Sequence, residues 1–207
     1  MVDPNQHDKF VLRQRVKLVI NQYEFFLPQE TENGVEEGDP FCFVEQKRFK
    51  FKEDIRFYTD EAKSQVLVKI LARQRFDPRA RYDITDAAGA KVGEIQKVFG
   101  ASLFRSTYTL FDAAGTELCT VREVSMPKAI FRRLVGFVPY LGDFADWLPI
   151  AYDFEFIRGE EVLGLSTRRR WKWRDIYDMD FTPDTNKVID RRLVLATAVG
   201  LDALQAR

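Results

Sequence analysis

The sequence has few of the side chains on which common enzyme mechanisms and extracellular folds depend. Its single histidine is His7, which excludes Ser-His-Asp triads, Cys-His dyads and zinc sites built on histidine. Its two cysteines, Cys42 and Cys119, are too few for a disulfide framework and are not spaced as metal ligands. No long apolar segment follows Met1 as in a secretory signal. We therefore expect a cytoplasmic protein, with Cys119 at an apolar core position rather than acting as a nucleophile.

The chain also lacks a net charge. Lysine and arginine together number 32, and aspartate and glutamate together number 32 as well. No overall field therefore attracts nucleic acid or a membrane, and any such binding must come from a local patch. With 207 residues, 45% of them hydrophobic, the chain is long enough for one sizeable core. We expect a disordered lead over residues 1–9 and a single domain over residues 10–207.

No hydrophobic run is long enough to cross a membrane, which takes roughly 20 apolar residues. The most apolar segment, residues 193–201, contains one polar residue, Thr197, and is bounded by Arg191 and Arg192 before it and Asp202 after it. Wound as a helix, this segment would have no polar face, so protein must surround it on all sides. We predict a buried helix over about residues 188–205 and no transmembrane span.

One pattern recurs at three places and predicts three hairpins. A tyrosine is followed seven residues later by a glycine in the pairs Tyr82 and Gly89, Tyr108 and Gly115, and Tyr152 and Gly159. Alternate apolar residues after each tyrosine make a first strand, the glycine allows the positive φ of a turn, and a second apolar strand follows. Repeated hairpins indicate an antiparallel meander, which at about a dozen strands curls or closes into a barrel.

Three segments break the strand pattern. Residues 28–40 are acidic and have no apolar period, so we predict an exposed and mobile loop there. Residues 175–184 are predicted to be an acidic loop before the terminal helix. Pro127 and Pro139 frame a short helix, and the basic and aromatic composition of residues 128–148 suits a membrane interface. The alternative for this segment is a helix that caps one mouth of the barrel.

The chain resembles the tubby C-terminal-like superfamily and is most similar to its LURP-one-related and phospholipid scramblase branch. The resemblance is carried by the hairpins at residues 82–93 and 108–118, by the Gly159 hairpin and by residues 188–204. It implies a mainly β fold: a closed antiparallel barrel of roughly twelve strands with the hydrophobic C-terminal helix threaded through its centre. One or two short helices are expected between strands.

The functions that the resemblance implies are varied. Tubby proteins bind phosphoinositides, scramblases are reported to move lipid between leaflets under calcium, and the LURP-one-related members have no settled biochemistry. The chain has neither the Pro-rich N-terminal extension nor the palmitoylated cysteine clusters of scramblases. The resemblance therefore does not extend to those membrane anchors.

Basic residues alternate with aromatic ones in two predicted strands. The first set is Arg48, Lys50 and Lys52, and the second is Arg168, Arg170, Lys172 and Arg174. Guanidinium groups on one strand face can hold phosphate bidentately, and the neighbouring tryptophans suit a lipid headgroup region. These seven residues form the candidate site for an anionic ligand. The alternative is an edge strand protected from aggregation by its charge, or one paired with the acidic residues 36–39 and 175–184.

Four aspartates before the predicted helix are the candidates for calcium ligands: Asp175, Asp178, Asp180 and Asp184. Their spacing is not that of an EF-hand loop, and the segment lacks the glycine and the terminal glutamate of that loop. A solvated turn that leads into the helix is the other interpretation. We therefore predict no cofactor and no metal, with calcium as the alternative.

These observations favour a non-enzymatic protein. Because a helix would fill the lumen, binding must use the outer surface or the rims of the barrel. The leading prediction is a peripheral module that binds anionic phospholipid from the cytoplasm through the seven basic residues. The alternatives are a soluble adaptor that binds another protein and a calcium-dependent phospholipid scramblase. No nucleic-acid partner is expected.

Overall fold

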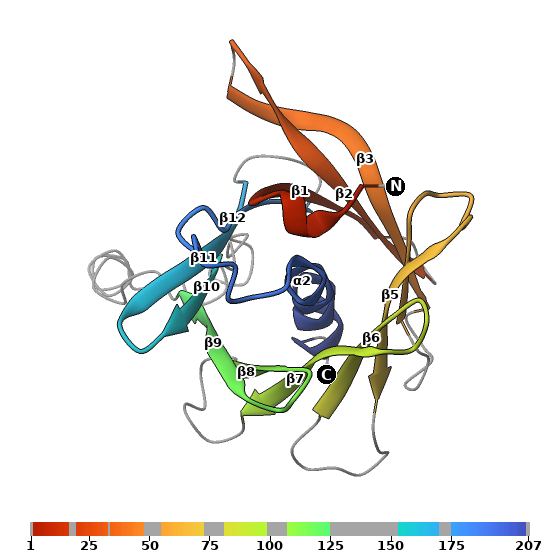
Figure 1. The fold of residues 1–207 in the computed structure, drawn as a ribbon. Helices are drawn as coiled ribbons and strands as arrows, with labels where there is room; N and C mark the ends of the chain where they lie inside the picture. Colours follow the sequence, from red (N-terminus) through yellow and green to blue (C-terminus); the bar gives the residue numbers. More distant parts are fainter. Residues whose placement is uncertain are drawn as a thin grey trace, which may run out of the picture.

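The described part of the chain folds into twelve β-strands that close into an antiparallel barrel around one helix (Figure 1). The computed structural model describes residues 2–16, 20–32, 34–47, 55–72, 81–98, 107–124, 153–169 and 175–205. The strands are β1 (Lys9–Val16), β2 (Ile20–Thr31), β3 (Gly34–Lys47), β4 (Ile55–Tyr58), β5 (Val66–Ala72), β6 (Arg81–Asp86), β7 (Lys91–Val98), β8 (Thr107–Asp112), β9 (Glu117–Val124), β10 (Asp153–Arg158), β11 (Glu161–Arg168) and β12 (Asp175–Asp180). A 3-10 helix, η1 (Pro4–Gln6), precedes β1, and α2 (Arg191–Gln205) follows β12. The predicted barrel with its C-terminal helix is confirmed.

The three predicted hairpins are present as β6–β7, β8–β9 and β10–β11. Their turn glycines have positive φ angles, 88° at Gly89, 89° at Gly115 and 62° at Gly159. In the first turn, the Asp86 side chain accepts a hydrogen bond from the Ala90 N–H at 2.9 Å. The Asp-x-x-Gly sequence therefore stabilises the turn through two residues. The aspartate side chain accepts a backbone hydrogen bond across the turn, and the glycine adopts the positive φ that the turn requires.

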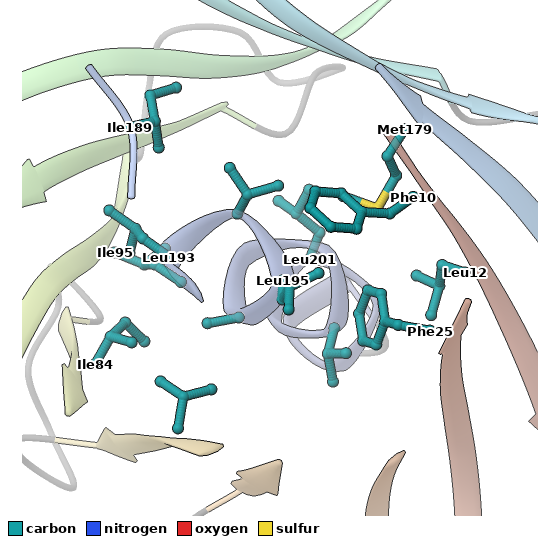
Figure 2. Close-up of a cluster of buried hydrophobic side chains, with 14 of the residues drawn as sticks. Phe10, Leu12, Phe25, Ile84, Ile95, Met179, Ile189, Leu193, Leu195 and Leu201 are labelled. Carbon is teal, nitrogen blue, oxygen red and sulfur yellow. The ribbon is translucent and has the colours of Figure 1, made fainter. Parts of the chain in front are cut away.

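α2 occupies the centre of the barrel, as its lack of a polar face predicts (Figure 1). Leu195 and Val199 are both 0% exposed. The hydroxyl of Thr197, the one polar group in the apolar run, donates to the Leu193 carbonyl at 2.7 Å and so needs no partner from the barrel. Figure 2 shows that side chains from β1, β2, β6, β7 and β12 surround the helix: Phe10, Leu12, Phe25, Ile84, Ile95 and Met179. The helix itself begins at Arg191 rather than near residue 188.

The wall and the helix are in close contact where β7 passes the first turn of α2. A Cβ added at Gly93 would lie 2.9 Å from a methyl carbon of Leu193. The added Cβ would also lie 2.6 Å from the backbone carbonyl oxygen of Phe111, which cannot move aside as a side chain can, so a glycine is needed at this point of the wall. The interior is therefore filled by the helix and the core side chains around it.

The segment predicted as an acidic loop at residues 175–184 is partly a strand, and this prediction was wrong. β12 pairs with β1 on one side and with β11 on the other, so it closes the barrel. Its acidic residues give no apolar alternation, and one of its two strand partners, β1, lies far away along the chain, so the sequence did not show this role. Between the end of β12 and the start of α2, residues 181–190 form turns or irregular backbone.

Residues 28–40 also differ from the prediction of a mobile loop. β2 and β3 continue as a pair through this segment, from Pro28 opposite Glu37 to Thr31 opposite Gly34. The segment has no apolar period because it extends beyond the barrel wall and faces no core (Figure 1). Backbone hydrogen bonds rather than hydrophobic burial define it as a strand pair.

The first residues of the chain are ordered where residues 2–9 are described, in contrast to the predicted disordered lead. The Asn5 side chain accepts a hydrogen bond from Arg191 N at 2.8 Å and donates to Asp190 Oδ1 at 3.3 Å. The lead thus caps the start of α2, a contact between residues too far apart in the sequence to be predicted. The short helix predicted between Pro127 and Pro139 lies outside the described residues.

Candidate functional site

The basic segment at the end of β11 is described at its first two residues, Arg168 and Arg169. Arg168 is half-buried and lies opposite Tyr177, whose ring packs against the core, so Arg168 is on the core-facing side of the sheet. Arg169 is on the outer side, where its Nε and Nη2 donate to the two Asp178 oxygens at 2.8 and 2.7 Å. This bidentate pair raises the pKa of Arg169. Pairing with the acidic segment, one alternative from the sequence, therefore holds for Arg169.

The remaining six candidate residues lie outside the described residues: Arg48, Lys50, Lys52, Arg170, Lys172 and Arg174. The strands on either side still define where these segments are attached. The first segment joins the end of β3 to the start of β4, and the second joins the end of β11 to the start of β12. Because neighbouring strands are antiparallel, all odd-numbered strands end at the same end of the barrel. Both basic segments therefore connect strands at one end.

We call this end the basic end because of the sequence of its connections. The connections between the described strands there are residues 17–19, 48–54, 73–80, 99–106, 125–152 and 169–174. In every one of them lysine and arginine outnumber aspartate and glutamate. The three tryptophans of the chain, Trp147, Trp171 and Trp173, also belong to these connections. Basic and tryptophan side chains together are typical of a surface that meets lipid headgroups.

The opposite end of the barrel lacks this excess of basic residues. Its connections are residues 32–33, 59–65, 87–90, 113–116, 159–160 and 181–190, and in none of them do lysine and arginine outnumber aspartate and glutamate. Some carboxylates that flank these turns are structural: the Thr116 N–H donates to Asp112 at 2.8 Å and lowers the pKa of that carboxyl. A chain of zero net charge is thus polarised along the barrel axis.

The structure gives each described calcium candidate its own protein partner. Asp178 binds Arg169, and Asp180 accepts from Thr182 N at 2.9 Å and lies 3.7 Å from Lys9 Nζ. The side chain of Asp175 lies outside the described residues. In the described ranges, no group of three or more His, Cys, Asp or Glu side chains is placed to hold a metal ion. The three described aspartates are therefore not brought together into one site.

The fourth candidate, Asp184, is fully buried and belongs to an ion network at the start of α2. Arg191 is also 0% exposed, and its Nη1 donates to Asp184 Oδ2 at 2.7 Å and to the Ile189 carbonyl at 2.9 Å. Its Nη2 donates to Asp8 Oδ1 at 2.7 Å, and its guanidinium lies 5.3 Å from the centre of the Phe181 ring. In the sequence, Arg191 is recognisable only as one of two arginines that precede the apolar run at residues 193–201. A charged residue at the start of a fully enclosed helix must be paired. The position of Arg191 at the start of the predicted buried helix could therefore have indicated an acidic partner.

The two cysteines are buried core residues. Burial raises the pKa of Cys119 to about 12 and raises that of Cys42 further. Thiols that stay protonated at neutral pH are poor nucleophiles. This agrees with the interpretation of Cys119 as part of the core, where it is 2% exposed.

A family model for LURP-one-related proteins matches residues 42–202, which is most of the chain. The chain belongs to the LURP-one-related family. This family lies within the tubby-like superfamily, so the resemblance carried by the hairpins and the terminal helix is confirmed. The match runs from the middle of β3 into α2 and therefore includes both basic segments. No curated protein matches this LURP-one-related chain.

Across the described ranges of this LURP-one-related protein, none of the helices has the length and apolar character needed to cross a membrane.

Proposed function

We propose that this LURP-one-related protein is a non-enzymatic, peripheral module that binds anionic phospholipid with the basic end of its barrel. The site consists of the basic residues that follow β3 and β11: Arg48, Lys50, Lys52, Arg170, Lys172 and Arg174. Arg168, the last residue of β11, is on the core-facing side of the sheet and is not part of it. The observation that carries the proposal is topological. The antiparallel meander attaches two basic segments, more than a hundred residues apart, to the same end of one barrel.

The filled interior supports binding at an end rather than inside. Leu193, Leu195 and Val199 are 0% exposed, so the lumen has no room for a lipid chain of the kind that open barrels enclose. A headgroup would therefore be held from outside by charge. Each basic residue near an anionic surface contributes about 1 kcal/mol, so several together give reversible adhesion that salt weakens.

Arginine and tryptophan have complementary roles in this mechanism. A guanidinium group binds a phosphate through two parallel hydrogen bonds, whereas an indole ring favours the boundary between headgroups and acyl chains. The segment at residues 170–174 alternates these two types of side chain. The acidic opposite end would be repelled by the same surface, so the barrel would bind in one orientation, with the start of α2 away from the lipid.

Vesicle co-sedimentation tests the proposal. We expect the protein to pellet with phosphatidylcholine vesicles that contain phosphatidylserine, to stay in solution with pure phosphatidylcholine, and to be released by salt. Reversing two charges at the basic end, Lys50→Glu with Lys172→Glu, should weaken binding at least about 30-fold, from about 1 kcal/mol per residue. The matched control reverses two cations at the opposite end, Lys63→Glu with Arg158→Glu, both on exposed or half-exposed positions.

Two results would refute lipid binding by the basic end. One is the absence of vesicle binding at low salt, and the other is equal loss of binding in the two double variants. The same assay with calcium or a chelator addresses the scramblase alternative. Binding that needs calcium, followed by transfer of labelled lipid between leaflets, would replace the proposed function with that activity.

A further inference from the structure

The β2–β3 hairpin extends beyond the barrel as a two-stranded arm. β1 stops pairing with β2 at Phe26, and β3 pairs with β4 only at Phe43 and Val44. Within the described part of the chain, residues 27–39 therefore pair only with each other, and Pro40 pairs with Phe26 at the base of this segment. We call this segment the arm; Figure 1 shows it projecting from the barrel wall. Its turn joins an even-numbered to an odd-numbered strand, as the turns of the acidic end do, but its Glu36 and Glu37 act electrostatically on Arg169 at the start of the second basic segment.

The base of the arm is held in place on the outer wall of the barrel. The pairing of β2 and β3 shifts register on both sides of Phe26, and such bulges bend a strand pair. Arg13 of β1 then lies 4.5 Å from the centre of the Phe26 ring and donates to Glu37 of the arm at 2.6 Å. Phe26 is buried on this outer face together with Val11 and Ile176. The arm is therefore a positioned element rather than a loose loop.

One edge of the arm directs backbone groups of two residues away from its strand partner. Thr31 and Gly34 are opposite each other across a two-residue connection, so they form a hydrogen-bonded pair. Pairing then alternates, and the backbone N–H and C=O groups of Val35 and Glu37 are directed away from β2. The corresponding edge of β2 is interrupted, because Pro28 has no N–H to donate. The outer edge of β3 is thus able to accept another strand.

The charge of the arm defines which strand it would accept. No lysine, arginine or histidine occurs between Lys17 and Lys47, whereas the arm and its tip carry several acidic residues: Glu30, Glu32, Glu36, Glu37 and Asp39. In the described residues, Glu37 is the arm residue with an ion-pair partner, Arg13. Glu36 and Asp39 are exposed beside the available edge. Val35, 45% exposed, adds an apolar contact.

We propose that the outer edge of β3 in the arm, residues 34–39, binds an extended lysine- or arginine-rich segment of a partner protein as an added β-strand. Backbone hydrogen bonds to Val35 and Glu37 would supply the pairing. The carboxylates of Glu36 and Asp39 would select basic side chains and disfavour acidic ones. This role does not require lipid, since the strand edge at residues 34–39 includes none of the basic residues of the proposed lipid site. It also accounts for a strand pair that is maintained outside the core.

The test uses the full-length protein and a short labelled peptide that alternates lysine and valine, with fluorescence anisotropy as the readout. We expect salt-sensitive binding, and no binding of the matching peptide with glutamate in place of lysine. Val35→Pro removes one outward-facing N–H without changing charge, and it should weaken binding at least tenfold. The matched control is Glu30→Ala, which removes a charge on the β2 edge and should change affinity less than threefold. Thermal melts of both variants show whether the barrel remains folded.

Three outcomes would overturn this inference. The first is a wild-type protein that does not bind the lysine peptide at low salt. The second is equal binding by the wild type and Val35→Pro, which would mean attraction by charge without strand pairing. The third is self-association: a molecular mass in solution that rises with protein concentration for the wild type but not for Val35→Pro. A second copy of this chain, rather than a partner protein, would then occupy the β3 edge. Loss of vesicle binding by the basic-end variants, with peptide binding intact, separates this inference from the proposed function.

Discussion

Replacing Asp184 by alanine should destabilise the barrel by about 3–5 kcal/mol, the usual cost of removing one partner of a buried ion pair. Both side chains of the pair are 0% exposed, and their closest approach is 2.7 Å. Asp184 also accepts hydrogen bonds from the N–H groups of Val188 at 2.8 Å and Ile189 at 3.1 Å. The variant therefore leaves a buried guanidinium group with fewer partners and two backbone donors without theirs. Since the free energy of unfolding of a domain is only about 5–15 kcal/mol, this loss would be a large fraction of it.

Urea unfolding followed by circular dichroism measures this loss. With a slope of about 2 kcal/mol per molar urea, the midpoint should fall by about 1.5–2.5 M. The matched control is Asp180→Ala, whose side chain is 48% exposed and whose ion pair with Lys9 spans 3.7 Å. That variant should lose less than about 1 kcal/mol, as exposed ion pairs do. The two aspartates are four residues apart and differ mainly in burial.

A double-mutant cycle with Arg191→Met sharpens this prediction. Replacing both members of a buried ion pair by apolar residues is often nearly neutral, so the double variant should be less destabilised than the sum of the single variants, with a coupling of about 1–3 kcal/mol. Purely additive losses, or a loss below about 1 kcal/mol for Asp184→Ala, would refute the role of the ion pair. A loss seen only when calcium is present would instead mean that Asp184 is a metal ligand. We expect the same loss in a chelator.

Three further predictions concern the core and the start of α2. Leu195→Ala should cost about 2–5 kcal/mol in urea unfolding, because it leaves a cavity at a position that is 0% exposed; a loss below 1 kcal/mol would contradict an enclosed helix. Cys42 and Cys119 should resist alkylation at pH 8 in the folded protein and react once it is unfolded, since burial raises the pKa of Cys119 to about 12 and that of Cys42 further; rapid labelling of either thiol in buffer would count against this. Partial burial acts to raise the pKa of Asp8, but hydrogen bonds from Lys187 and Arg191 outweigh it and hold that pKa below its ordinary value. The stability that Asp8 contributes is therefore present above about pH 4 and is lost as the pH falls further. Asp8→Asn should reduce the change in the urea unfolding midpoint between pH 6 and pH 3. A midpoint that changes with pH as much as in the wild type would argue against the ion pairs of Asp8 with Lys187 and Arg191.

The features that could be predicted from the sequence have local signals. The absence of a polar face over residues 193–201 was enough to predict an enclosed helix, and Asp-x-x-Gly turns were enough to predict two of the hairpins. Both signals depend on residues within a few positions of each other. The family resemblance then supplied the number of strands and the closure of the barrel.

The features that were missed depend on residues distant in the sequence. β12 contains three aspartates in six residues, and only its pairing with β1 and β11 makes it a strand. The ion network around the buried Arg191 also includes Asp8, which is 183 residues earlier in the chain. The arm has no apolar pattern because it faces no core, so hydrophobic periodicity could not distinguish it from a loop. The common end of the two basic segments likewise follows only from the order of the strands.

Tryptophan quenching by brominated lipid tests most directly whether the basic end of the barrel binds the membrane. All three tryptophans belong to connections that join strands at that end, so the intrinsic emission of the unmodified protein reports on these connections. We predict strong quenching by brominated phosphatidylcholine in vesicles that contain phosphatidylserine, and none in vesicles that lack it. A protein that pellets with the anionic vesicles while its tryptophan emission stays unquenched would be bound through another surface, which would contradict the proposed function.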